Sequence, residues 1–376
     1  MLREYQKGNN MDTKELFFKL LSFKSITPDD GGAFEFIKDY MKDFKSVRLD
    51  KKGIKNLFLY KKFGEGKHLC FAGHIDVVPS GEGWDSDPFV PVEKNGYIYA
   101  RGAQDMKSGV CAFLQACKEC KKFDGTLSLL LTSDEEGEAK FGTVEVLNYL
   151  KKENFLPDFA VVAEPTCEKI FGDTVKIGRR GSINGYLTLK GRQGHAAYPD
   201  KSINPINLIA PILFKIAGID LDSGDENFAP SKFVITDIRS GMQVTNVTPD
   251  KLDMMFNVRN STKTSKSDIE SFVYKNFKGF ETEIRLKQSS KPFLTNRNSK
   301  IVKLMSKTIK ECTKVNPSLS TSGGTSDARF FGEFEVETVE FGVKNDTIHS
   351  VNERTTLKEV KKLEEVFKTL INNLKG

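Results

Sequence analysis

Residues 69–79 are Leu-Cys-Phe-Ala-Gly-His-Ile-Asp-Val-Val-Pro, an apolar run followed by a glycine, a histidine and an aspartate. The apolar part is typical of a buried strand, and Gly73 permits a turn after it. Open α/β sheets bind their ligands beyond the carboxyl ends of the strands. We therefore expect His74 and Asp76 to project together at such an end, where Asp76 can accept the second N–H of the imidazole. A surface histidine beside an unrelated aspartate is the alternative.

Strands and helices alternate on both sides of this run. Apolar periodicity predicts helices at 13–23, 34–44, 106–120 and 144–152, and strands at 56–60, 69–72, 127–132 and 159–163. Such an alternation favours an α/β fold, with a mostly parallel sheet and helices on both of its faces.

The pattern changes after Gly181. Strands are predicted at 183–190, 232–238, 252–258 and 282–286, with helices at 205–217 and 267–277. This order, βαββαβ, is typical of ferredoxin-like α+β domains. The first pattern resumes near Lys291, with a helix at 300–312, a strand at 337–341 and a helix at 357–374. We therefore expect a discontinuous catalytic domain, 1–180 with 291–376, and an inserted domain, 181–290, that is placed to act as a lid.

Composition limits the class of protein. The chain has 376 residues, 38% of them hydrophobic and 29% charged, which indicates a globular protein of two to three domains. The net charge of +6 is spread without blocks of like charge, which argues against a nucleic-acid partner. Six scattered cysteines fit a reducing, cytoplasmic location. The apolar runs are too short to span a membrane, and the first ten residues lack the features of a secretory signal.

Acidic residues follow or precede several predicted elements. Asp105 comes before a helix, where capping is the commonest role for an aspartate. Three acids in Ser133–Gly137 follow a buried strand, and crowded carboxylates raise one another's pKa unless a cation lies among them. Because neighbouring side chains diverge, we expect Glu136 to face a metal and Glu135 to face the substrate as a proton shuttle. A solvated acidic loop is the alternative.

Two more segments complete a set of candidate metal ligands. Glu164 follows an apolar strand, and His349 follows a strand near the C-terminus. The full set is His74, Asp105, Glu136, Glu164 and His349. Two imidazoles with three carboxylates suit Zn²⁺, with Mn²⁺ or Co²⁺ as substitutes. If two ions are held, one carboxylate must bridge them.

Five motifs follow one another along the chain: His74-Ile-Asp76 with Val-Val-Pro, Gly102-Ala-Gln-Asp105-Met-Lys, Ser133-Asp-Glu-Glu-Gly137, Ala163-Glu-Pro-Thr166 and Ile348-His349. In this order they resemble the motifs of the dinuclear zinc aminoacylase and carboxypeptidase family. The resemblance implies two Zn²⁺ per subunit, with Co²⁺ or Mn²⁺ possible in one site. It also implies that Asp105 bridges the ions, that His74 and Glu164 complete one site, and that Glu136 and His349 complete the other. Glu135 is the implied general base, and Asp105-Met106 the implied cis peptide.

Further motifs narrow the resemblance: Gly178-Arg-Arg-Gly-Ser182, Gly191-Arg-Gln-Gly-His-Ala-Ala-Tyr-Pro199 and Gly323-Gly-Thr-Ser-Asp-Ala-Arg329. They resemble family members that act on a succinylated diamino acid, a small polyanion. Acetylated amino acids, as used by enzymes of the acetylornithine deacetylase and aminoacylase types, are the alternative substrates. The resemblance also implies a homodimer formed through the inserted domain. His195 would then reach the partner's active site and stabilise an oxyanion.

Arginine forks bind carboxylates in a bidentate manner, so a polyanionic substrate favours a pocket with several of them. The residues that the resemblance places around that pocket are Arg179, Arg180, Ser182, Asn246, Arg259, Gly324, Thr325 and Arg329. A surface salt bridge is the alternative role for each arginine alone.

Other classes of protein are less consistent with the sequence. A silent binding protein on this scaffold would be expected to lack Glu135 or a metal ligand, and all are present. Nucleic-acid binding would need clustered basic residues interleaved with aromatic residues. Cys117-x-x-Cys120 lies within a helical pattern and has no second pair to form a metal or redox site. Ser326 lacks the turn motif of a serine nucleophile.

Overall fold

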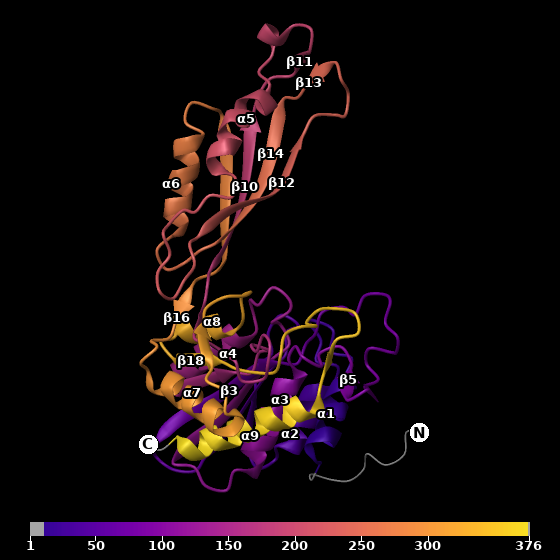
Figure 1. The fold of residues 1–376 in the computed structure, drawn as a ribbon, viewed down its shortest axis with the longest axis vertical. Coiled ribbons are helices and arrows are strands. Elements are labelled where there is room, and N and C mark those ends of the chain that lie inside the picture. The colour runs from indigo at the N-terminus through magenta and orange to yellow at the C-terminus, as the bar shows by residue number, and fades with distance from the viewer. Residues whose placement is uncertain (1–10, 375–376) are drawn as a thin grey trace. The chain divides into compact units, whose positions relative to one another are not determined.

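The computed structural model describes residues 11–374, and these form two compact units (Figure 1). The first unit contains the chain up to Gly178, Leu294–Ser320 and the chain from Ser326 onward. The second unit contains Arg179–Phe293 and Thr321–Thr325. The prediction about a secretory signal falls on the first ten residues and lies outside the described residues. Within 11–374, no helix combines the length and the apolar character needed to cross a membrane.

An eight-stranded sheet forms the centre of the first unit, in the order β1-β2-β6-β3-β7-β18-β8-β17. Its strands are β1 (Lys45–Arg48), β2 (Asn56–Lys62), β3 (Lys67–His74), β6 (Gly125–Thr132), β7 (Phe159–Val162), β8 (Thr174–Lys176), β17 (Ser318–Ser320) and β18 (Glu337–Glu340). The central strands β6, β3, β7 and β18 are mutually parallel, whereas β1, β2 and β8 add antiparallel pairs. The sheet is therefore mixed, and the predicted parallel arrangement holds at its centre.

The central strands are buried along almost their whole length. Phe71 of β3 lies opposite Leu129 of β6 and Val161 of β7, and all three side chains are inaccessible to solvent. Strands covered on both faces have such continuous apolar runs, because they lack a solvated side. Since these strands are parallel, their carboxyl ends meet at one edge of the sheet. That edge follows His74, Thr132, Val162 and Glu340.

Helices cover the sheet of the first unit. They are α1 (Thr13–Leu21), α2 (Ala33–Tyr40), α3 (Lys107–Glu119), α4 (Thr143–Lys152), α7 (Lys300–Thr313), α8 (Ala328–Glu333) and α9 (Leu357–Asn373). Helix α3 packs on β3 with α1 and α9 beside it, and α4 packs on β2 and β6. A capping box between Asp12 and Glu15 starts α1. The predicted helix 34–44 ends earlier, at Tyr40, although Met41 and Phe44 remain buried.

Several short strands were not predicted. The strands β4 (Val92–Lys94), β5 (Tyr97–Tyr99) and β19 (Arg354–Thr355) form a small separate sheet. Arg354 pairs with Tyr99, so this sheet anchors the chain that follows His349. The strands β9 (Gly178–Arg179) and β16 (Phe293–Leu294) lie where the chain passes between the units. Two or three residues carry too little periodicity for a strand to be predicted from sequence.

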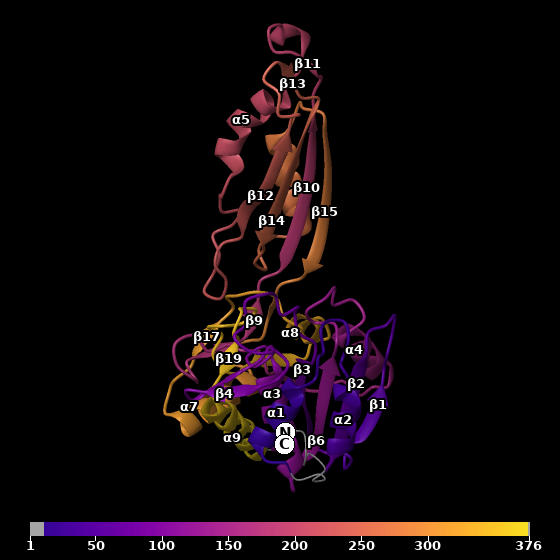
Figure 2. The same cartoon turned by 90° about the vertical axis from the view of Figure 1, so that its right-hand side faces the viewer.

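The second unit has a four-stranded antiparallel sheet in the order β12-β14-β10-β15 (Figure 2). Along the chain the elements are β10 (Ser182–Lys190), α5 (Pro205–Ile216), β12 (Lys232–Ser240), β14 (Lys251–Arg259), α6 (Lys266–Asn276) and β15 (Thr282–Ser290). The remaining elements are β11 (Gly194–His195), the 3₁₀ turn Pro199–Lys201 and β13 (Val247–Thr248). The predicted βαββαβ order and the predicted fold class, α/β with an inserted ferredoxin-like α+β domain, are confirmed.

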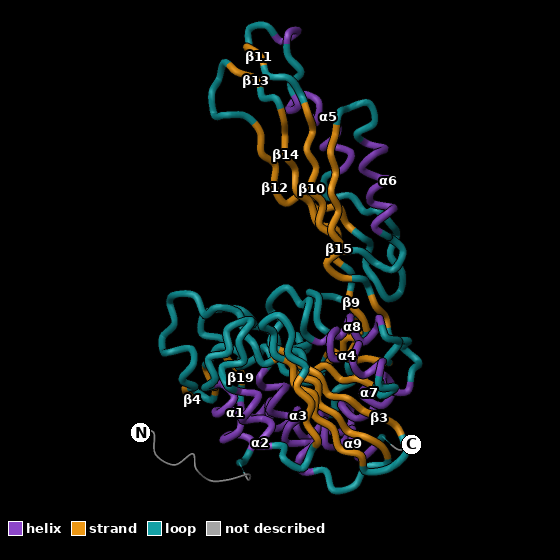
Figure 3. The backbone as a smooth tube through the Cα atoms, turned by 180° about the vertical axis from the view of Figure 1, so that it is seen from behind, coloured by secondary structure: helices purple, strands orange, loops and turns teal. Residues whose placement is uncertain are grey.

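The two faces of this smaller sheet differ. Helices α5 and α6 lie on one face of the sheet (Figure 3). The side chains of Leu187 and Phe256 are buried on that face. On the other face, the side chains of Val234 on β12 and Met255 on β14 are about 40% exposed. The strand β12 is also an edge of the sheet. The second unit therefore presents apolar side chains beside an edge strand of its sheet.

Candidate metal centre

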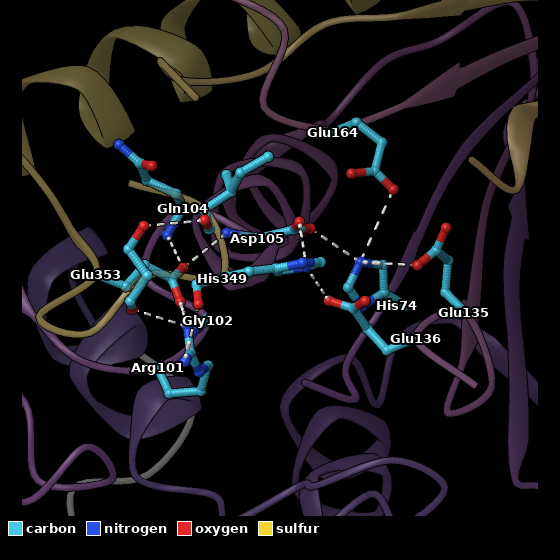
Figure 4. A network of polar contacts seen from close by, with 12 residues as sticks. His74, Arg101, Gly102, Gln104, Asp105, Glu135, Glu136, Glu164, His349 and Glu353 are labelled. Atoms are coloured by element: carbon cyan, nitrogen blue, oxygen red, sulfur yellow. Dashed lines mark hydrogen bonds and ion pairs between the residues drawn. The ribbon is translucent and has the colours of Figure 1, made fainter. Parts of the chain in front are cut away.

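Histidine and carboxylate side chains converge at the carboxyl edge of the central strands (Figure 4). His74 ends β3, Glu135 and Glu136 follow β6, and Glu164 follows β7. His349 comes from the loop after β18, and Asp105 from the turn before α3. The sequence therefore folds so that residues separated by up to 275 positions meet at this edge, because parallel strands bring their ends together.

Asp105 lies between the two imidazoles. Its Oδ1 is 3.1 Å from Nε2 of His74, and its Oδ2 is 3.4 Å from Nε2 of His349. The N-cap of α3 is Met106, which makes no side-chain capping bond, so the alternative of Asp105 as a helix cap is wrong. The Asp105–Met106 peptide bond is cis, as the family resemblance implies. Each carboxylate oxygen of Asp105 thus faces a different histidine.

The remaining acids divide between the two histidines. Glu164 Oε1 is 3.8 Å and Glu135 Oε2 is 3.9 Å from Nε2 of His74. Glu136 Oε1 is 2.9 Å from Nε2 of His349. Glu135 and Glu136 therefore face different imidazoles, although they are neighbours in sequence.

The orientation of His74 differs in one respect from the expectation. Its Nδ1 is 2.8 Å from the main-chain oxygen of Asp76, whereas the Asp76 carboxylate is 3.7 Å away. The carboxylate instead accepts a hydrogen bond of 3.1 Å from the main-chain amide of Glu136. Because a carbonyl oxygen only accepts, Nδ1 carries the proton and Nε2 is left facing Asp105. Asp76 thus orients His74 through its backbone and holds the Glu136 loop through its side chain.

The electrostatics of this cluster favour bound positive charge. Burial raises the pKa of Glu135 and of Glu164, and raises the pKa of Asp76 to about 6. Burial opposes protonation of His74, but the bond to Asp105 and the nearby acids outweigh it and raise the pKa of His74. Hydrogen bonds to Asp105 and Glu136 raise the pKa of His349 to about 10. Carboxylates outnumber imidazoles here, so cations would relieve the repulsion.

The donor set fits a divalent metal. Single ligand atoms of His74, Asp105 and Glu136 lie within 4.8 Å of one another. Glu164 Oε1 is buried and has no hydrogen-bond partner among the described residues. A buried carboxylate oxygen without a partner is costly unless a cation or a proton satisfies it. Nitrogen and oxygen donors in this mixture suit Zn²⁺, Co²⁺ or Mn²⁺.

His195 and Asn246 lie in the second unit, on the ribbon formed by β11 and β13. His195 is exposed and pairs with Val247, and its Nδ1 accepts a hydrogen bond of 3.1 Å from the amide of Ala197. The main-chain oxygen of Asn246 accepts a hydrogen bond of 2.9 Å from the amide of Ala196. His195 is therefore exposed on the second unit, and its role in a partner's site stays a prediction.

Three predicted substrate-binding arginines also lie in the second unit. Arg179 is buried and donates a hydrogen bond of 3.1 Å to the main-chain oxygen of Ser322. A Cβ atom at Gly323, whose φ is +102°, would lie 2.5 Å from Nη1 of Arg179. Burial and the positive charge of Arg180 lower the pKa of Arg259, which places these two guanidinium groups within electrostatic reach of each other.

The other predicted pocket residues occupy both units. Ser182 is buried and accepts a hydrogen bond of 3.0 Å from Nδ2 of Asn257. Gly324 is exposed and Thr325 is half-buried in the segment Thr321–Thr325 of the second unit. Arg329 belongs to α8 of the first unit and is buried there. Its Cζ lies 4.5 Å from the ring centroid of Phe330.

Glu353 is a further residue of this region that was not predicted. Its carboxylate accepts hydrogen bonds from the main-chain amides of Gly102, Gln104 and Asp105. It also forms a 2.8 Å ion pair with Arg101. The sequence offers only a weak signal, an acidic residue four positions after His349, because backbone amide donors leave no motif in the sequence.

The chain belongs to peptidase family M20/M25/M40, whose model matches residues 70–373. This match confirms the family resemblance of the sequence motifs. The chain is 64% identical, over 97% of its length, to all of a protein of Sulfurimonas denitrificans named succinyl-diaminopimelate desuccinylase. It is also 64% identical, over 96% of its length, to all of a protein of the same name from Nitratiruptor sp..

Solved structures share the fold. The crystal structure of aminopeptidase PepT from Bacillus cereus has a TM-score of 0.80 to this structure. The match covers 96% of this chain and 98% of the aminopeptidase chain, at 19% sequence identity. At this identity the likeness concerns the fold, including the presence of both units.

Proposed function

We propose that the chain is a metal-dependent amide hydrolase that cleaves N-succinyl-LL-2,6-diaminopimelate to succinate and LL-diaminopimelate, a step of diaminopimelate and lysine biosynthesis. The observation that carries this proposal is the position of the Asp105 carboxylate between His74 and His349. The name shared by the relatives at 64% identity favours the succinylated substrate over an acetylated one.

The proposed metal centre uses the two sets of groups around Asp105. His74 and Glu164 would hold one ion with Asp105, and Glu136 and His349 would hold the second. Zn²⁺ is the proposed metal, with Co²⁺ or Mn²⁺ as a substitute in one site. Bound ions of this kind polarise an amide carbonyl and make water a stronger nucleophile near neutral pH.

Glu135 is the proposed general base. It would accept a proton from water as the oxygen attacks the succinyl carbonyl, and would give that proton to the nitrogen as the C–N bond breaks. The products are then a carboxylate, succinate, and a free amine on diaminopimelate. The raised pKa of Glu135, caused mainly by burial, supports this role because a base works best when its pKa lies near the working pH.

The carboxylates of the substrate would be held by guanidinium groups. Arg180 and Arg259 are near enough to repel each other, and Nε of Arg180 is buried without a hydrogen-bond partner among residues 11–374. An anionic ligand would reduce the repulsion between these guanidinium groups and would accept a hydrogen bond from Nε of Arg180. The other proposed contacts are Arg179, Arg329, Ser182, Asn246, Gly324 and Thr325.

We also propose a homodimer formed through the second unit, in which His195 stabilises the oxyanion in the partner's site. The exposed apolar side chains of Val234 and Met255, on and beside the edge strand β12, support such an interface. Mixing His195→Ala and Glu135→Gln protomers tests it, because a mixed dimer retains one site with both groups intact. Recovered activity would support the arrangement, and none from verified heterodimers would contradict it. The six free cysteines support the proposed cytoplasmic location.

A substrate panel tests the proposed reaction. The metal-loaded protein is assayed with N-succinyl-LL-diaminopimelate, N-acetylornithine and an N-acetylated neutral amino acid, and release of the free amine is measured. We expect the highest kcat/KM for the succinylated compound. A higher value for an acetylated compound would contradict the proposed substrate and favour the alternative deacylase.

A further inference from the structure

The carboxylate of Glu353 collects four hydrogen-bond donors from one turn of the chain (Figure 4). Oε1 accepts from the amides of Gln104 at 2.7 Å and Asp105 at 3.0 Å. Oε2 accepts from the amide of Gly102 at 2.9 Å and from Nη1 of Arg101 at 2.8 Å. Glu353 therefore fixes the backbone of the turn that ends at Asp105.

Arg101 extends this arrangement to two other segments. Its Nη1 donates to the main-chain oxygen of Ser350 at 3.2 Å, and its Nη2 donates to that of Ser80 at 3.0 Å. The first acceptor follows His349, and the second lies in the loop after His74. The Arg101–Glu353 pair thus links the three segments that carry His74, Asp105 and His349.

Stability alone is a weak explanation for this pair. Arg101 is 2% exposed and Glu353 is fully buried, so both charges have lost their hydration. Replacing a buried ion pair by apolar side chains is often neutral or stabilising, because desolvation offsets the attraction. His349 has a left-handed backbone with φ of +57°, a conformation that other contacts must maintain. The Arg101–Glu353 pair can maintain this conformation, because Arg101 bonds to the main-chain oxygen of Ser350, the residue after His349.

We infer that Glu353 is a positioning residue, which holds the main chain of Asp105 so that one carboxylate oxygen faces each histidine. The inference rests on the metal centre put forward under the proposed function. Hydrogen bonds behind metal ligands affect metal affinity by about 10–100-fold. In this chain, Glu353 holds the metal ligand Asp105 through the backbone amide of Asp105 and through that of Gln104.

The test compares Glu353→Gln with Glu364→Gln. Glutamine has nearly the shape of glutamate, but its NH₂ group would face two N–H donors and remove at least two of the four bonds. Glu364 provides the control, since it is also a buried acid of the first unit and accepts a 2.6 Å hydrogen bond from Thr13 Oγ1. Zn²⁺ affinity and the visible absorption spectrum of the Co²⁺-loaded protein are measured at a temperature where all variants are folded.

For Glu353→Gln we expect Zn²⁺ affinity to fall by about 10–100-fold and the Co²⁺ spectrum to change, whereas Glu364→Gln should match the wild type. An unchanged affinity and spectrum in folded Glu353→Gln would overturn the inference. Absence of metal from the wild type would instead refute the proposed function itself.

Glu353→Asp is the second variant. It keeps the negative charge but is shorter by one methylene, so we expect an affinity between those of the wild type and Glu353→Gln. If Glu353→Gln does not fold, Glu353→Asp is measured in its place. If neither folds while Glu364→Gln does, Glu353 is needed for folding and the positioning role is overturned.

Discussion

Oε2 of Glu135 lies 3.9 Å from Nε2 of His74, which is close enough for attraction but too long for a hydrogen bond. Burial raises the pKa of Glu135. Its neighbour Glu136 instead lies at bonding distance from His349. One of two adjacent acids is thus bonded to an imidazole, whereas the other lies beyond hydrogen-bond distance of His74.

We predict that Glu135→Gln keeps its metal and loses kcat by about 10²–10⁴-fold, because the amide cannot accept the proton. Metal content and steady-state kinetics are measured on the same preparation. Glu138→Gln, an exposed position in the same loop, is the control and should retain activity. Normal turnover in metal-replete Glu135→Gln would show that another group is the base.

We predict that His349→Ala loses at least one bound ion per chain after dialysis against a fixed concentration of free Zn²⁺. The imidazole contacts both Asp105 and Glu136, so its removal opens one half of the site. Elemental analysis gives the metal content. His68→Gln serves as the control, since His68 is buried against Ser128 at 2.7 Å, away from this cluster. Equal metal content in His349→Ala and wild type would exclude His349 as a ligand.

His68 provides a prediction about pH and stability. Burial lowers the pKa of His68 to about 4, from 6.5 in the unfolded chain. Between these values the unfolded state binds more protons, so the free energy of unfolding falls as the pH drops from about 6.5 to 4. Compared with His68→Gln in chelator-containing buffer, the wild type should lose up to about 3 kcal/mol more over this window. Urea unfolding gives both profiles, and parallel profiles would refute the prediction.

Gly323 leaves the space in which the Arg179 guanidinium lies. In Gly323→Ala the added Cβ would meet Nη1 at 2.5 Å and displace it, so we expect KM for the succinylated substrate to rise about tenfold. Gly279→Ala is the matched control, because its φ of +91° imposes similar backbone strain while the added Cβ meets open space. An unchanged KM in Gly323→Ala, or an equal rise in both variants, would argue against a binding role for Arg179.

The fold was largely predictable because its main elements carry clear periodicity. The buried runs of β3 and β6 and the alternation in β10 and β14 determine strand positions without knowledge of the tertiary structure. The end of α2 was not predictable, since Met41 and Phe44 continue the apolar pattern after the helix has ended. Apolar periodicity indicates which residues are buried. It does not mark the end of a helix when the residues that follow the helix are also buried.

Side chains at strand ends were predictable as a group, because parallel strands bring their carboxyl ends together. Contacts made by the main chain were not. His74 donates to the backbone oxygen of Asp76, and Glu353 accepts from backbone amides at 102, 104 and 105. Backbone donors and acceptors exist at nearly every position, so residue types do not show which of them a side chain will meet.

The most direct measurement is the rate of N-succinyl-LL-diaminopimelate hydrolysis by metal-depleted protein as Zn²⁺ is added back. We predict almost no turnover before addition and a rise that saturates at about two ions per chain. Full turnover by protein that elemental analysis finds free of transition metal would contradict the metal centre around Asp105.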